Sequence, residues 1–160
     1  MKILVAAIGR LKDDAEGVLV ARYRDRIDAL GRAHALGPVS IAELAEGRAG
    51  SVAARKADEA TRLLAACAPA DRLIALDEGG QSRSSREFAT LIAGLRDQGT
   101  GMLAFAVGGP DGHGPELLAA ATHKLAFGPM TLPHGLARAV LLEQLYRAAT
   151  IIARHPYHRD

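Results

Sequence analysis

The chain has 160 residues and a mass of 16.8 kDa, which suits one domain of ordinary size. With 49% hydrophobic residues, 24% charged residues and a mean hydropathy of +0.06, the composition excludes a disordered chain. The net charge of +2 is too small for a strong nucleic-acid footprint, and 4% aromatic residues without Trp disfavour a sheet that stacks bases.

Apolar runs alternate with amphipathic helical segments in the first half of the chain. Residues 2–8 form a continuous apolar run closed by a glycine, which predicts a strand buried on both faces of a parallel sheet. Apolar residues recur at helical spacing over 13–31, so an amphipathic surface helix is expected there. A second strand is expected at 39–44 and a second helix over 52–68, which Pro69 ends.

The same alternation continues in the middle of the chain. A third strand is expected at 72–76, followed by the polar, glycine-rich turn DEGGQSRSS. A helix over 85–97 comes next, with Ser84 or Ser85 as its N-cap and Glu87 in its first turn. The run MLAFAVG at 102–108 predicts another buried strand.

The chain ends in a long helix that is apolar on almost all sides. The loop GGPDGHGPE leads into a short helix at 115–122, and a brief strand is expected at 124–128. The final helix is expected over 134–154, and because such a helix must be covered on more than one side, we infer that another subunit covers part of it. Together the elements predict an α/β fold, a mostly parallel sheet flanked by helices, in a single domain of residues 1–160.

Three of the predicted strand ends carry residues suited to hold a ligand. Six of the 17 glycines lie between positions 99 and 114, and the loop GGPDGHG follows a buried strand directly. Ligands of open α/β sheets bind beyond the carboxyl ends of strands, where glycine lets the main chain approach them closely. The proline-stiffened loop GPMTLPHG and the end of the third strand are further candidates. Each loop alone is equally well explained as a turn or a helix start, but all three would form one pocket if their strands are neighbours.

Other sequence features limit the chemistry and the cellular setting. Cys67 is the single cysteine, which excludes an internal disulfide, and its alanine-rich surroundings predict a buried, unreactive thiol. His155 and His158 have no partner at metal spacing, so no metal is expected. The P-loop, nucleophile-elbow and zinc-protease motifs are absent. The apolar N-terminal run is too short for a secretory signal, and no run approaches a membrane span, so we expect a cytoplasmic protein that does not bind membranes.

Several motifs in a fixed order resemble the RlmH family of ribosomal RNA methyltransferases. They are VGGPDGHG, then TLPH with the following Arg138, then LLEQLYRA and the terminal HPYHR. The opening KILVAAIG, the segment LIALDEGGQSRSS and the chain length agree as well, so the resemblance covers essentially the whole chain. It implies a SPOUT-type fold, a homodimer, and a C-terminal trefoil knot in a cofactor-binding part at about residues 72–160. Knots are rare in proteins, and no periodicity argument predicts one.

The resemblance also implies an activity. Members of the family transfer a methyl group from S-adenosyl-L-methionine to N3 of a pseudouridine in 23S rRNA of the large ribosomal subunit, which makes the assembled ribosome the expected partner. A knotted methyltransferase acting on tRNA and a non-catalytic ribosome-binding factor remain alternatives. A Rossmann-type enzyme is disfavoured, because the first strand lacks a glycine fingerprint.

Residues matching the family's motifs are the implied cofactor contacts and catalytic candidates. The cofactor contacts would be Leu76, Gly108, Gly109, Gly128, Pro129, Met130, Thr131, Leu132 and Pro133. Loss of the proton from an imide nitrogen needs a base or a stabilising cation, and the candidates are His134, Arg138, Tyr157, His158 and Arg159. The last three would reach the cofactor of the partner subunit, and His158 and Arg159 rank first. Phosphate contacts, or equally a solvated face, are expected at Lys12, Arg22, Arg24, Arg26, Arg83 and Arg86.

Overall fold

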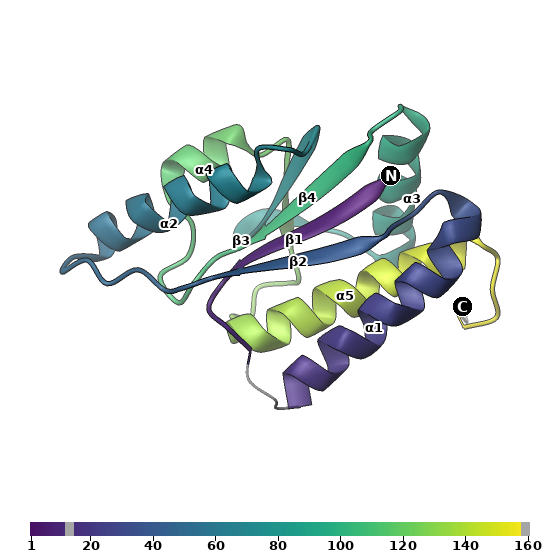
Figure 1. The fold of residues 1–160 in the computed structure, drawn as a ribbon, viewed down its shortest axis with the longest axis horizontal. Coiled ribbons are helices and arrows are strands. Elements are labelled where there is room, and N and C mark those ends of the chain that lie inside the picture. The colour runs from purple at the N-terminus through teal and green to yellow at the C-terminus, as the bar shows by residue number, and fades with distance from the viewer. Residues whose placement is uncertain (12–14, 158–160) are drawn as a thin grey trace.

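Five strands form one parallel sheet between two layers of helices (Figure 1). The computed structural model describes residues 1–11 and 15–157. In chain order the elements are β1 (Lys2–Ile8), α1 (Ala15–Gly31), the 3₁₀ turn η1 (Arg32–His34), β2 (Val39–Leu44), α2 (Val52–Cys67), β3 (Arg72–Ser82), α3 (Ser85–Asp97), β4 (Met102–Val107), α4 (Pro115–Ala120), β5 (His123–Ala126) and α5 (His134–Ile152). The strand order is β2-β1-β4-β3-β5, and every pairing is parallel, so the predicted fold class is confirmed.

Both faces of the sheet are buried, which explains the continuous apolar runs of the central strands. Along β1, Ile3 and Val5 pack on the side of α1, α3 and α5, while Leu4 and Ala6 pack on the side of α2 and α4. Successive side chains of a strand point to opposite faces, so a strand covered on both sides has no polar positions. Cys67 belongs to the second layer, where burial raises the pKa of its thiol to about 11, as expected for a buried, unreactive cysteine.

The long helix α5 is covered mainly by its own chain. It packs against α1 and α3 and lies under the sheet, and ten of its residues are buried (Figure 1). The apolar character on almost all sides therefore does not by itself require a second subunit. The contacts with α1 and α3 account for much of the pattern, and cover by a second subunit stays a prediction.

Strand β3 is longer than the sequence predicts. The turn expected after residue 76 is instead a bulge inside the strand: Leu125 of β5 is the partner of both Leu76 and Gln81, and pairing continues to Ser82. Gly80 makes this possible, because a Cβ there would lie 2.7 Å from the main-chain nitrogen of Leu125. Polar and glycine residues that resemble a turn thus let two backbones approach closely within a sheet.

The remaining elements match the predictions to within a few residues. Ser84 is the N-cap of α3. The main-chain nitrogen of Ser84 donates a hydrogen bond to the Glu87 carboxylate at 2.7 Å, which forms a capping box. The first helix begins at Ala15, and the expected start at residues 13 and 14 lies outside the described residues. None of the helices in the described ranges is both long and apolar enough to cross a membrane. The trefoil knot stays a prediction.

Candidate functional site

A cavity of about 850 Å³ lies at the bulge of β3 and at the carboxyl ends of β4 and β5. Its walls are residues 76–79 of β3, the loop 108–113 after β4, and the segment 125–134 that leads from β5 into α5. These three chain segments meet because β3 lies between β4 and β5 in the sheet. The volume falls in the range of about 300–1,000 Å³ that is typical of small-molecule sites. The expectation that three strand ends form one pocket is therefore confirmed.

Most of the residues implied as cofactor contacts line this cavity. They are Leu76, Gly108, Gly109, Gly128, Met130, Thr131, Leu132 and Pro133. Pro129 lies in the same segment but does not line the cavity. His134, a catalytic candidate, also lines it from the first turn of α5.

Two polar lining residues were missed by the sequence reasoning. Lys56 comes from α2, on the other side of the sheet from α5, and on an amphipathic helix nothing distinguishes it from a solvated lysine. His113 lies inside the motif GGPDGHG, so its place in a ligand loop was the available signal. Two acidic residues in the bulge of β3, Asp77 and Glu78, line the cavity as well.

Glycines let the loop after β4 lie directly on the body of the protein. A Cβ on Gly109 would be 3.0 Å from Oε2 of Glu59 and 3.0 Å from Cγ2 of Ile8. A Cβ on Gly114 would be 2.8 Å from the main-chain oxygen of Lys56. A side chain at either position would push the loop away from α2 and change the shape of the cavity wall.

An ion pair holds the same loop to α2. Arg55 donates from Nε to Oδ2 of Asp111 at 2.7 Å, and from Nη1 to the main-chain oxygen of Ala49 at 3.2 Å. The hydrogen bond from Arg55 lowers the pKa of the Asp111 carboxyl. Asp111 is therefore a carboxylate with its counter-charge already in place.

His113 is a buried polar side chain that faces the cavity. It is 4% exposed, and the main chain of Leu76 and Ala106 interacts with its ring nitrogens, although neither contact has the geometry of a full hydrogen bond. Burial lowers the pKa of the imidazole, and the Asp77 carboxylate and these main-chain contacts oppose this shift only in part. A neutral imidazole has one donor and one acceptor nitrogen, which are the groups that His113 brings to the cavity wall.

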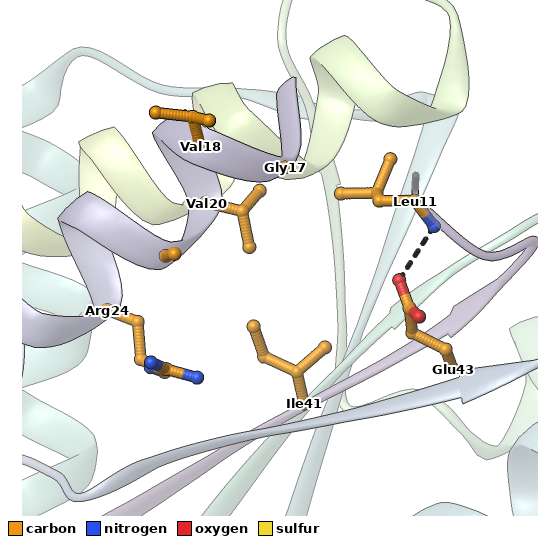
Figure 2. A pocket seen from close by; sticks show the side chains of 8 residues that line it. Leu11, Gly17, Val18, Val20, Arg24, Ile41 and Glu43 are labelled. Atoms are coloured by element: carbon orange, nitrogen blue, oxygen red, sulfur yellow. Dashed lines mark hydrogen bonds between the residues drawn. The ribbon is translucent and has the colours of Figure 1, made fainter. Parts of the chain in front are cut away.

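Arg138, another catalytic candidate, does not line the cavity. It is fully buried in α5, and its Nη1 donates to Oε1 of Glu43 on β2 at 2.8 Å. The same carboxylate oxygen accepts a hydrogen bond from the main-chain nitrogen of Leu11 at 2.9 Å (Figure 2). Arg138 thus ties α5 to β2 and to the chain after β1.

A second, smaller hollow lies between α1 and β2 (Figure 2). Its volume is about 400 Å³, and Val18, Val20 and Ile41 give it apolar walls. Arg24, a predicted phosphate contact, lines this hollow, and its side chain pairs with Asp25 at 2.9 Å. None of the residues implied as cofactor contacts is found here.

The C-terminal tail starts at the end of α5 opposite to the cavity. α5 has 19 residues, and at 1.5 Å per residue it separates the two by about 28 Å (Figure 1). The Tyr157 ring packs edge-on against Tyr146 with centroids 4.8 Å apart, and its hydroxyl is 3.3 Å from Oε1 of Glu143. Burial, with smaller effects of Tyr23 and Glu143, raises the pKa of Tyr157 to about 12.

The other predicted residues are spread over the surface. Arg22 and Arg26 are exposed on α1, and Arg83 and Arg86 line a groove of about 570 Å³ beside α3. Lys12, His158 and Arg159 lie outside the described residues. Within the described part of the chain, no three His, Cys, Asp or Glu side chains gather as a metal site would require.

Comparisons with known proteins place this fold and cavity in a family. The family model "Predicted SPOUT methyltransferase" matches residues 1–158. The chain is 47% identical to the ribosomal RNA large subunit methyltransferase H of Methylocella silvestris and 50% identical to that of Phenylobacterium zucineum, each over 100% of both chains. It is 48% identical to the protein of the same name from Mesorhizobium japonicum over 99% of both chains.

A solved structure from Porphyromonas gingivalis, described as a member of the TrmH family, is more distant. It is 15% identical, with a TM-score of 0.40 over 89% of this chain and 58% of that chain. The family model and the curated relatives span the whole chain, and they confirm the resemblance seen in the motifs. This chain belongs to the SPOUT methyltransferase family.

Proposed function

We propose that this chain methylates N3 of a pseudouridine in 23S rRNA, using S-adenosyl-L-methionine. The observation that carries the proposal is the cavity at the strand ends, which is lined by nearly all of the residues implied as cofactor contacts. The relatives, named as ribosomal RNA large subunit methyltransferases, support the substrate class. In this proposal residues 1–160 form a single domain whose C-terminal part, from about residue 72, binds the cofactor and contains the knot.

The chemistry of the cavity fits this cofactor. When bound, S-adenosylmethionine supplies a methyl group that is already activated as a sulfonium. Leu76 and Leu132 provide apolar contact area for a nucleoside, and the main chain around Gly109 and Gly128 can approach it closely. The imidazole of His113, whose main-chain contacts lack full hydrogen-bond geometry, can hydrogen-bond to a polar atom of the same ligand.

The catalytic groups would come from a second subunit. The reason is that the tail begins at the end of α5, about 28 Å from the cavity of its own chain. A symmetric homodimer would place the tail of each chain over the cavity of the other. In such a dimer Tyr157, packed on α5, anchors the tail.

Each candidate residue has a different role in the proposed reaction. His158 accepts the proton that the imide nitrogen must lose, and Arg159 stabilises the anion or binds an RNA phosphate. His134, at the cavity wall, helps to orient the base. Arg138 acts as a positioning residue, because it pairs with Glu43 and does not line the cavity.

The assembled ribosome is the substrate that the small net charge favours. A chain with a net charge of +2 gains little from the phosphates of free RNA. Shape recognition of a folded ribosomal surface, with phosphate contacts from exposed arginines such as Arg22 and Arg86, would supply the rest. The reaction would then take place in the cytoplasm.

The direct test is transfer of labelled methyl from S-adenosylmethionine to ribosomes that lack the modification, followed by mapping of the labelled base. We expect label at N3 of one pseudouridine in the large-subunit RNA, and none on ribosomes already modified there. Label on tRNA alone would contradict the substrate. Failure to bind S-adenosylmethionine would contradict the enzyme and favour a non-catalytic ribosome-binding factor.

A tail deletion tests the assignment of the catalytic groups. Removing residues 155–160 should abolish single-turnover transfer while leaving cofactor affinity within a few-fold of the intact chain, because the tail is not part of its own cavity. Unchanged transfer would show that the proton acceptor lies elsewhere.

A further inference from the structure

We propose that Lys56 binds the carboxylate at the amino-acid end of S-adenosylmethionine. This inference rests on the proposed function and adds a residue to its ligand site. The sequence motifs give no reason to choose Lys56, which lies on α2, outside the segments that carry the family resemblance.

Acidic side chains outnumber lysines and arginines among the described residues that line the cavity. Among the described residues that line it, Lys56 is the only lysine or arginine, against the acidic side chains of Asp77, Glu78 and Asp111. The two lining histidines, His113 and His134, are not fixed positive charges, and the pKa of His113 is lowered by burial. A negatively charged group of a ligand therefore has one permanent cation to bind in this part of the chain.

The Asp111 carboxylate pairs with Arg55, and the charge of Lys56 has only a smaller effect on it. Asp111 is held by Arg55 at 2.7 Å, which gives that carboxylate its own counter-charge. Lys56 makes no ion pair or hydrogen bond with another side chain in residues 1–11 and 15–157. The neighbouring Arg55 thus keeps Asp111 from competing for the Lys56 ammonium.

The backbone of Lys56 is fixed beside the ligand loop. Its main-chain oxygen lies 2.8 Å from the position of a Cβ on Gly114, so α2 and the loop are in direct contact there. The side chain is half-buried, which limits the directions that its ammonium can take.

The proposed ligand has a matching group. The adenosine end suits the glycine-rich and apolar wall formed by Leu76, Gly109 and Leu132. The amino-acid end is a zwitterion, and its carboxylate needs a cation or donors to replace water. An ammonium–carboxylate hydrogen bond is about twice as strong as a neutral one, and in a half-open site it weakens with salt.

Calorimetric titration with two ligands separates the carboxylate contact from a general effect on the cavity. The ligands are S-adenosylhomocysteine and 5′-methylthioadenosine, which keeps the nucleoside but has no carboxylate. The variants are Lys56→Gln, the conservative Lys56→Arg, and Lys2→Gln as a matched control at the opposite end of the sheet, where Lys2 is exposed.

We expect Lys56→Gln to weaken S-adenosylhomocysteine about tenfold and to leave 5′-methylthioadenosine unchanged. Lys56→Arg should restore most of the loss, and the loss should shrink at high salt. Equal weakening of both ligands, or no weakening of either, would overturn the proposal. So would unchanged affinity for S-adenosylhomocysteine with a raised KM for ribosomes, because Lys56 would then bind RNA phosphate. If the unaltered chain bound neither ligand, the proposed function itself would fail.

Discussion

Two of the catalytic candidates, Arg138 and Tyr157, make contacts with other parts of the fold that the sequence does not reveal. Arg138 is buried and paired with Glu43, a partner 95 positions away on a different strand. Tyr157 packs on Tyr146, and its hydroxyl donates to Oε1 of Glu143 at 3.3 Å, where burial raises its pKa to about 12. The motif predicted their positions in the chain, but a motif does not show which side chain pairs with a distant element.

Neutralising Glu43 should destabilise the fold. In Glu43→Gln the buried Arg138 guanidinium loses the charge of Glu43, and since Glu43 is itself 32% exposed, we expect a loss of about 2 kcal/mol rather than the larger cost of a fully buried pair. Urea unfolding would measure it. Glu46→Gln, at an exposed position on the following loop, is the control and should change stability by less than about 0.5 kcal/mol. Equal effects of the two substitutions would mean that the ion pair adds nothing.

His113 should make the fold less stable in acid. Burial lowers its pKa below the ordinary value of 6.5, so below that pH the unfolded chain binds a proton that the folded chain does not. Stability from this group is thus fully present above pH 6.5 and falls as the pH drops, by at most about 1.4 kcal/mol per pH unit for one proton.

The variant His113→Leu should flatten the pH dependence of the unfolding free energy below pH 6.5. His155→Gln, at an exposed position, should leave the same curve unchanged. Identical slopes for all three proteins would show that His113 does not titrate in this range.

At the scale of elements, the sequence predicts buried strands well and fails where two backbones come into close contact. β1 and β4 are continuous apolar runs, and their bounds were predicted to within one residue. The extension of β3 to Ser82 could not be predicted, because Gly79 and Gly80 favour a turn locally and only the adjacent β5 makes them part of a strand. The pocket depends on this sheet order, which local pattern does not determine.

Two glycine substitutions should have opposite signs. In Gly80→Ala the new methyl group would meet the backbone of Lys124 and Leu125 at 2.7 Å, and we expect a loss of about 2 kcal/mol as β5 is displaced. Gly94 lies inside α3 with nothing within 4 Å of its Cβ position, so Gly94→Ala should gain about 0.5–1 kcal/mol from helix propensity. Thermal unfolding of both variants measures the two changes in stability. A neutral Gly80→Ala would mean that the two strands do not need to approach closely.

At the scale of the whole molecule, the cavity lies at the start of α5 and the tail begins at its end. The N-terminus is at the same side of the molecule as the end of α5, while α5 begins at the other side, next to the end of β1 (Figure 1). The apolar surface of α5, which suggested a partner subunit, is largely covered by α1 and α3. Separation of the cavity from the tail is therefore the stronger argument for a homodimer.

Complementation between two inactive variants tests this account most directly. One variant lacks residues 155–160, and the other carries Ala137→Phe, which places a ring in the cavity wall on α5. Both should fold and dimerise but fail to transfer methyl groups to ribosomes. A heterodimer purified through two different tags has one intact cavity facing one intact tail, so we predict about half of the activity of the unaltered homodimer. A heterodimer as inactive as its parents, or an active tail-deleted homodimer, would contradict a reaction centre shared between two subunits.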